Sequence, residues 1–494
     1  MNIYLATLVA YSLLMIALGA WVSARVRQSN QFFVAGRNLG SGLLFATMLA
    51  ANIGAGSTVG ATGLGYNQGY SAWWWVGSAG IGSLILAMTV GPKIWTIARD
   101  HNLYTVGDYL EHRYNKATRV TGAAFLWFGG LTILSGQVIA VAWILNAIAG
   151  TSKALGCLLA IVAITTYFAA GGLHSAARVN ILQLIVKITG FLLALGFLGY
   201  SHGFGGLGNA ATAKLDPNAA QEYFSFSGNG VGTVVGFLIT LVPAFIVSPG
   251  LLQKIFGAKD TRSVRIGVTI NGICLLLFAA IPVIMGIIAR GYLPALQRNE
   301  LALPTLLTQL LPTWIGAFLL AAIFSAELSA ADAVLFMLTT SLGKDLYKGL
   351  LKPKATDRQL ITMTRLSVVL CGIVGLIFAI KLESVIQALS IFYSLMTAVF
   401  FLPVVGGLYW SRIPARAALL SIAVTVAVLT VLESGPKLVT AWPTARALGT
   451  VIDQIKTALP VPSLLIAIAA GGIVMITAAL LSPKPVVTKI QNAQ

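Results

Sequence analysis

Long apolar stretches recur along the whole chain and constrain its fold more than any other feature. A helix that crosses a bilayer needs about 20 apolar residues. Hydrophobic residues make up 57% of the 494 residues and charged residues 9%, which excludes a soluble globular domain. We predict an all-α, polytopic membrane protein with about thirteen transmembrane helices. The predicted spans are 2–24, 41–64, 70–95, 120–148, 154–171, 179–200, 232–251, 266–289, 313–343, 366–382, 385–410, 416–433 and 461–482.

Glycine or proline interrupts the second and the seventh of these spans. The first interruption follows Ala50 in the run AANIGAG, and the second is Ser248-Pro-Gly250. The two spans lie five apart, so they cross the membrane in opposite directions. A broken helix frees backbone groups that the bilayer tolerates only around a cavity or ligand. Broken helices at matching places in two halves indicate a secondary transporter built from inverted repeats.

The interrupted spans suggest how the chain is divided. We expect an N-terminal extra helix and inner loop, two five-helix repeats, and two C-terminal helices with a tail. The corresponding ranges are 1–40, 41–204, 205–411 and 412–494. The first span lacks a basic leader and a cleavage site, so it is expected to be retained.

The net charge of +18 reflects topology and not a nucleic-acid partner. Most lysines and arginines fall in alternate loops, which predicts an outer N-terminus and a cytoplasmic C-terminus in the plasma (cell inner) membrane. The expected partners are a small-molecule solute and membrane lipid, with no obligate protein partner. The three cysteines lie in apolar spans without metal-ligand spacing, and no nucleophile–base pair is readable, so we expect no enzyme and no cofactor. A channel or receptor is the competing class, but no continuous polar stripe or signalling domain is present.

Six motif stretches give the chain a resemblance to the sodium:solute symporter family over nearly its whole length. Their order and spacing are specific, although each alone is loose. The fourth to sixth resemble the choline-transporter branch more than the sugar branch, and the substrate branch stays open. The stretches are Phe32–Arg37, Ala50–Ile53, Thr105–Tyr114, Gly171–Ser175, Gln253–Lys259 and Ala321–Ala326, the last on a span that ends Lys344-Asp-Leu-Tyr347.

The resemblance implies a LeuT-like fold and symport of a small organic solute coupled to Na⁺. It places a sodium site at the carbonyls of Ala50, Ile53 and Ala322 and at the hydroxyl of Ser325. A hard cation needs several such oxygens. The alternative for Ser325 is a hydroxyl bonded to its own helix backbone.

The chain departs from this family at both expected sodium sites. Ala326 replaces a second serine or threonine, and Asn180 replaces the aspartate of members with a second site. Lys187 lies two turns from Asn180, about 10 Å further along the same helix face. An intramembrane lysine is a functional hypothesis by default. We therefore hypothesise that the ammonium of Lys187 replaces sodium, which would make transport sodium-independent or proton-coupled. The alternatives are a static ion pair or a lysine that reaches the membrane interface.

The acids within the predicted spans are Glu327 and Asp332, and either could be the counter-ion of Lys187. Asp332 is expected to face the cavity of Ser325, whereas Glu327 should point elsewhere. A structural polar lock between helices is the alternative for both.

Polar side chains beside the breaks are the candidates for binding the substrate. They could equally join helices together. Trp73 could form an aromatic wall suited to an organic cation, or belong to an interfacial belt. The candidates are Asn52, Ser57, Thr58, Gln137, Ser248 and Trp73.

Overall fold

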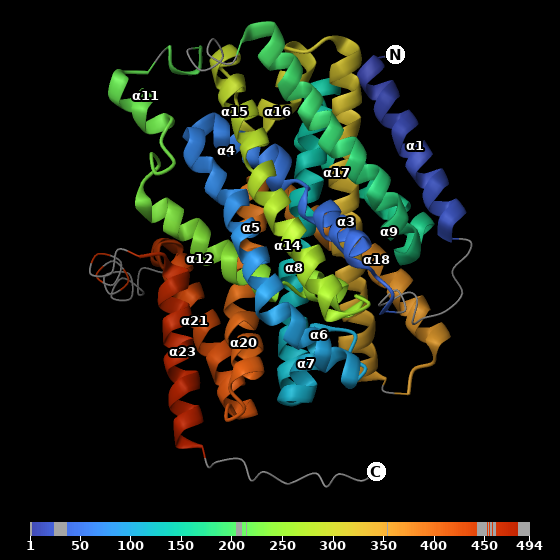
Figure 1. Cartoon of the computed structure of the whole chain (residues 1–494), viewed down its shortest axis with the longest axis vertical. Helices are drawn as coiled ribbons and strands as arrows, with labels where there is room; N and C mark the ends of the chain where they lie inside the picture. Colours follow the sequence, from blue (N-terminus) through green and yellow to red (C-terminus); the bar gives the residue numbers. More distant parts are fainter. Residues whose placement is uncertain are drawn as a thin grey trace.

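The computed structural model of the chain describes residues 2–23, 37–203, 210–213, 215–352, 354–441, 452, 454, 457 and 461–482. Each of the predicted ranges contains helix within the described residues, and the secondary structure there is helical without strands (Figure 1). The first half contains α1 (Ile3–Ser23), α3 (Ser41–Asn52), α4 (Ala61–Gln68), α5 (Trp73–Met88), α6 (Val90–Asp100), α7 (Val106–Arg113), α8 (Lys116–Ala149) and α9 (Lys153–His202). The second half contains α11 (Pro217–Tyr223), α12 (Val231–Val247), α13 (Pro249–Phe256), α14 (Thr261–Phe278), α15 (Ala280–Tyr292), α16 (Ala302–Gln309), α17 (Thr313–Thr340), α18 (Asp357–Lys381), α19 (Val385–Met396), α20 (Leu402–Tyr409), α21 (Ala415–Ala441) and α23 (Ser463–Leu481).

Nine helical runs in the described part of the chain are long and apolar enough to cross a membrane. Three shorter apolar helices, Ile3–Met15, Ser41–Asn52 and Lys153–Thr166, accompany them. The structure assigns one helix, α9, where the sequence predicted the spans 154–171 and 179–200. The side chain of Asn180 lies outside the described residues. The apolar helical runs make the protein a multi-pass membrane protein. The count of thirteen helices remains a prediction, because α9 covers two of the predicted spans.

Both interrupted spans are broken where glycine or proline predicted it. The helix α3 ends at Asn52, and Ile53 has extended backbone angles of φ −89° and ψ 91°. A π-helical turn, η2 (Gly56–Gly60), then leads into α4. In the second span α12 ends at Val247, Ser248 has φ −51° and ψ 117°, and Pro249 begins α13. Proline suits that position because its missing N–H would have no helical acceptor there.

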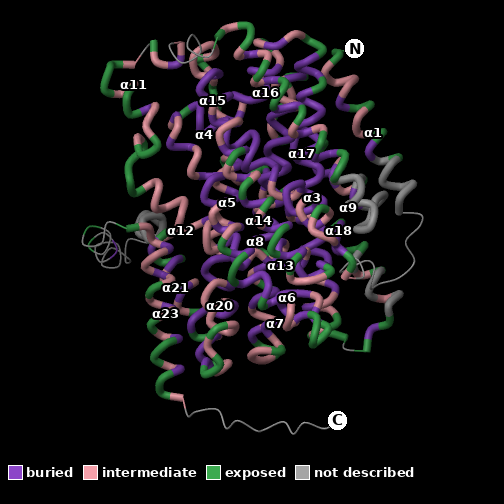
Figure 2. Tube along the Cα trace, viewed as in Figure 1, coloured by how far each residue is buried: buried purple, intermediate pink, exposed green. Residues whose placement is uncertain are grey.

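The helix α17 forms the buried centre of the molecule. It packs against α1, α3, α8, α9 and α18. The purple, buried trace in Figure 2 follows this central region, while α11, α21 and α23 lie at the edge. The start of α1 lies near the same end of the molecule as α15 and α16, and α6 and α7 lie at the opposite end (Figure 1). The polar side chains in the middle of α17, such as Ser325, Glu327 and Asp332, are therefore held inside the protein.

Candidate functional site

The ammonium of Lys187 lies on the carbonyl oxygens that the break in α3 exposes. It donates hydrogen bonds to Ala50 O at 2.9 Å and to Ile53 O at 3.2 Å, and the side chain is 0% exposed. These are the carbonyls that the family resemblance implies for a cation. Ser329 on α17 also donates to Ala50 O, at 3.3 Å. The sequence did not single out Ser329 as a ligand, although it lies one turn beyond Ser325.

The other two predicted cation ligands are used differently. The hydroxyl of Tyr11 on α1 donates to Ser325 Oγ at 2.5 Å. Within the described residues, Lys187 makes no hydrogen bond to Ser325 or Ala322. A helix outside the expected repeats therefore reaches the predicted cation pocket, which no sequence motif indicated.

Close packing between α9 and α17 holds Lys187 at this depth. Gly190 lies one turn from Lys187, and a Cβ added there would stand 2.9 Å from Ala322 Cβ and from Leu319 Cδ2. Real Cβ atoms do not approach other atoms so closely. The glycine therefore lets the two helices approach, which brings the ammonium of Lys187 toward the break.

The two acids of α17 have different lysine neighbours. Thr58 donates a hydrogen bond to Glu327 Oε1 at 2.7 Å, and Glu327 interacts electrostatically with Lys187. Asp332 interacts electrostatically with Lys254 instead. Glu327 points into the helix bundle, toward Thr58 on the first broken helix, and stays a candidate counter-ion of Lys187. The helix α17 is buried on nearly every side. Spacing along the helix from Ser325 therefore does not show which of its polar residues face the cation pocket.

A cavity beside the first break has aromatic walls. We call it the aromatic chamber, defined by Trp75, Gln137, Phe245 and Tyr393. Tyr393 packs against Trp75 and Phe245, with ring centroids 6.0 and 5.5 Å apart. Gln137 Oε1 accepts a hydrogen bond from Ala55 N at 2.9 Å. Because Oε1 accepts this bond, the amide NH₂ of Gln137 points away from Ala55. Gln137 lines the chamber, and its NH₂ is the group that could donate a hydrogen bond to a solute.

A second cavity adjoins the aromatic chamber at the break between α12 and α13. We call it the lysine chamber, defined by Ser248, Gly250 and Lys254. The two chambers share Asn52, Phe245 and Tyr393 in their walls. Both chambers therefore lie beside the broken helices, as expected of a solute site near mid-membrane.

The structure brings four of the six substrate candidates to these walls. Asn52, Ser57 and Gln137 line the aromatic chamber, and Ser248 lines the lysine chamber. Thr58 and Trp73 do not line either chamber: Thr58 bonds Glu327, and Trp73 Nε1 donates to Leu276 O at 3.3 Å. Trp75 takes the place expected for Trp73, because two residues turn a helix by about 200°.

Phe245, Tyr393 and Lys254 are wall residues that sequence reasoning missed as substrate candidates. Lys254 lies in one of the motif stretches, one turn after the proline break, and that position could have indicated it. Phe245 and Tyr393 carry no comparable sequence signal, because apolar helices contain many aromatic residues.

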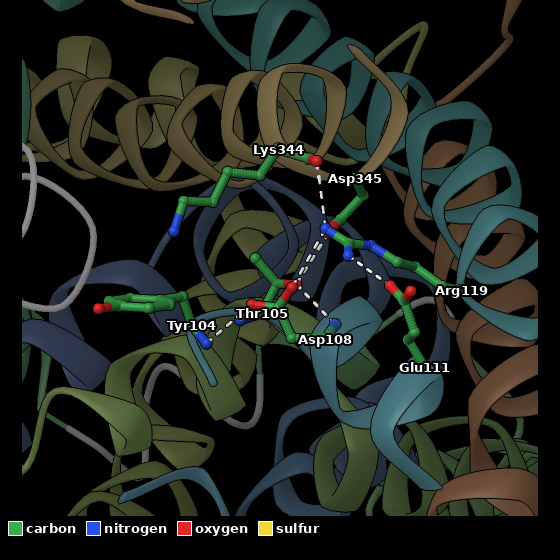
Figure 3. Close-up of polar contacts among 7 residues, drawn as sticks. All are labelled: Tyr104, Thr105, Asp108, Glu111, Arg119, Lys344 and Asp345. Carbon is green, nitrogen blue, oxygen red and sulfur yellow. Dashed lines mark hydrogen bonds and ion pairs between the residues drawn. The ribbon is translucent and has the colours of Figure 1, made fainter. Parts of the chain in front are cut away.

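Two motif stretches far apart in the chain meet in one ionic network (Figure 3). Arg119 on α8 pairs with Asp108, Glu111 and Asp345 at 3.1, 2.6 and 2.9 Å. Thr105 caps α7 and also donates to Asp345 Oδ1 at 2.9 Å. Asp345 belongs to η5 (Ser341–Leu351), the continuation of α17. The network therefore ties α7 and α8 to the end of the helix that carries the cation-site residues.

The two broken helices, the oxygen-lined pocket at one break and the cavity between them define a secondary active transporter. The sequence model of the sodium:solute symporter family matches residues 32–424. The chain belongs to the sodium:solute symporter family. It is therefore a symporter and not an enzyme, and sodium-coupled solute symport is the function that this membership indicates.

The chain is also similar to individual sodium-coupled symporters. The sodium/pantothenate symporter of Escherichia coli is 27% identical over 83% of this chain and 86% of its own length. The sodium/glucose cotransporter of Vibrio parahaemolyticus is 24% identical over 84% and 82%. A solved Na⁺-coupled sialic acid symporter in a substrate-bound, outward-open state has a TM-score of 0.75 at 18% identity, over 97% of this chain and 98% of its own. That likeness supports the LeuT-like fold.

Proposed function

We propose that this chain carries a small organic solute and that the ammonium of Lys187 takes the position of the coupling sodium ion. The observation that carries the proposal is the pair of hydrogen bonds from Lys187 Nζ to Ala50 O and Ile53 O. A sodium ion at these carbonyls would meet a fully buried ammonium within hydrogen-bond distance of the same oxygens. The two cations exclude each other there.

The contacts also suggest how Lys187 could link a proton to transport. The charged ammonium joins the broken end of α3 to α9, and Glu327 on α17 supplies the opposite charge nearby. A neutral amine would bind the carbonyls less strongly, since charge-assisted hydrogen bonds are about twice as strong as neutral ones. Loss of the proton would therefore loosen α3 from α9 and permit the break to move.

Sodium symport at the same pocket is the second candidate, and family membership favours it. It requires Lys187 to leave Ala50 O and Ile53 O, so that these carbonyls and Ser325 can surround the ion. Ser325 would then also have to share its hydroxyl with Tyr11.

Binding of ²²Na⁺ to the purified full-length protein separates the two candidates without knowledge of the solute. We expect the wild type to show no saturable binding in potassium medium. Lys348→Met, which removes an exposed lysine far from the site in sequence, is the matched control and should behave as the wild type. Saturable binding by the wild type that Ser325→Ala abolishes would overturn the replacement of sodium by Lys187.

The topology and repeats are part of the same proposal. Residues 41–204 and 205–411 would form the two repeats, because each contains one broken helix. The C-terminus would be cytoplasmic and the N-terminus outside, which places the basic loops inside the cell. A green fluorescent protein fused after Gln494 should then fluoresce in intact cells, whereas a dark fusion of full length would contradict this orientation.

The relatives are named for different substrates, so their names do not identify the solute of this chain, and the cavity must be used instead. One relative is named for pantothenate and another for glucose. We propose that the solute lies in the aromatic and lysine chambers, where Asn52, Gln137 and Ser248 offer polar groups between apolar walls.

A further inference from the structure

The charge of the two chambers gives information about the solute. Among the described residues that line them, Lys254 is the charged one, and none is an aspartate or a glutamate. Asp332 interacts with Lys254 from α17 without lining a chamber. Both residues are described, yet no ion pair within 4.0 Å joins them. Lys254 therefore lines the lysine chamber without a contact ion pair to Asp332.

The start of α13 adds partial positive charge at the same place. Ser248 precedes the helix without a side-chain cap, and Gly250 lies in its first turn on the chamber wall. Gly250 and Lys254 are four residues apart, so they share one face of the helix. A helix N-terminus attracts anions through its exposed N–H groups and its dipole. Together with the ammonium of Lys254, it favours a negatively charged group.

The aromatic chamber fits a different part of the same molecule. Its walls are rings and aliphatic side chains, and its polar atoms are neutral. Gln137 can donate through its NH₂ group. Asn52 donates its own NH₂ to Asn271 Oδ1 at 3.1 Å, which leaves its carbonyl oxygen as an acceptor. Such walls suit an apolar body with one or two hydroxyl or amide groups.

We propose that the solute is a small organic monocarboxylate, with its carboxylate on Lys254 and the start of α13 and its body in the aromatic chamber. This substrate class rests on the proposed transport function. An organic cation is disfavoured, although Trp75 and Tyr393 offer ring faces, because it would meet the ammonium of Lys254 with no acid on the walls. Asp332 is the group to which that ammonium can turn when the carboxylate leaves.

Thermal unfolding of the purified full-length protein in potassium medium tests the substrate class. The probes are pantothenate, proline and lactate, each compared with its uncharged or amide counterpart, pantothenol, prolinamide and propane-1,2-diol, and with choline and glucose. We expect at least one carboxylate to raise the unfolding midpoint in a saturable manner and its counterpart to have no such effect. Stabilisation by choline or glucose, or no stabilisation by any carboxylate in either potassium or sodium medium, would overturn the proposal.

Variants at Lys254 tie the effect to the site. Lys254→Met keeps the length of the side chain without its charge and should weaken carboxylate binding at least tenfold. Lys254→Arg should bind within a few-fold of the wild type, and Lys348→Met should match it. Undiminished carboxylate binding by Lys254→Met would also overturn the proposal. If the carboxylate effect needs Na⁺ but still depends on Lys254, the role of Lys187 fails while the substrate class stands.

Discussion

At Ser325 and Ala326 the side chains of α17 offer one hydroxyl, where the resemblance to the family implies two. Tyr11 already donates to that one hydroxyl, and Lys187 donates to the carbonyls opposite. A buried ammonium needs an opposite charge, since isolated charges are costly to bury. Glu327 is the acid that interacts with Lys187. Its Oε1 accepts from Thr58, while Oε2 has no hydrogen-bond partner within 3.5 Å among the described residues.

Glu327→Gln should destabilise the protein because it leaves Lys187 without a compensating charge. Removing one partner of a buried ion pair in direct contact costs roughly 3 kcal/mol. No ion pair within 4.0 Å joins Glu327 to Lys187 among the described residues, so we expect a loss below that figure. Glu327→Gln combined with Lys187→Met should recover part of this loss, which thermal unfolding of the single and double variants would measure. Thr58→Val removes the hydroxyl that bonds Glu327 Oε1 and Gly54 O without removing a charge, and should cost about 1 kcal/mol. If the stability loss of the double variant equals the sum of the losses of the two single variants, the two charges are not coupled.

At the level of helices, close contacts between glycine and neighbouring side chains set the position of the site. Gly190 lets α9 approach α17, and Gly54 fits between Ala330 and Gln137 Oε1. These glycines are needed because a side chain at either position would push apart the elements that hold Lys187, the first break and the aromatic chamber.

Gly190→Val should separate α9 from α17 and destabilise the protein by roughly 1–3 kcal/mol, the usual cost of overpacking. Gly196→Val is the matched control on the same helix, because a Cβ there would have no atom within 4 Å. The unfolding midpoint of each purified variant checks the difference. Equal midpoints would show that the contact of Gly190 with Ala322 does not limit the approach of the two helices.

At the level of the whole molecule, the sequence predicted features that depend on local order along one helix. Glycine and proline runs located both breaks, and the placement of Lys187 over Ala50 and Ile53 agrees with its depth along α9. Features that depend on how helices cross were not predictable. Tyr393 reaches Trp75 and Phe245 from a distant span, and Glu327 lies on a helix whose buried sides give no phase signal. Likewise, nothing in the sequence indicated that the motif stretches that contain Thr105 and Asp345 are in contact.

Arg119 should be the residue on which the contact of α7 and α8 with η5 depends. Its guanidinium pairs with three acids while its side chain is 14% exposed, and Asp345 is 2% exposed. Arg119→Met would leave the buried carboxylate of Asp345 without its ion-pair partner, so we expect a loss of roughly 3 kcal/mol in unfolding free energy. Arg119→Lys should lose less, because it keeps the charge but not the planar fork. The control is Arg99→Met, which removes an exposed pair with Asp100 and should cost less than about 1 kcal/mol. Thermal unfolding of the four proteins measures these differences, and an Arg119→Met variant as stable as Arg99→Met would show that α7 and α8 are held to η5 by packing and not by charge.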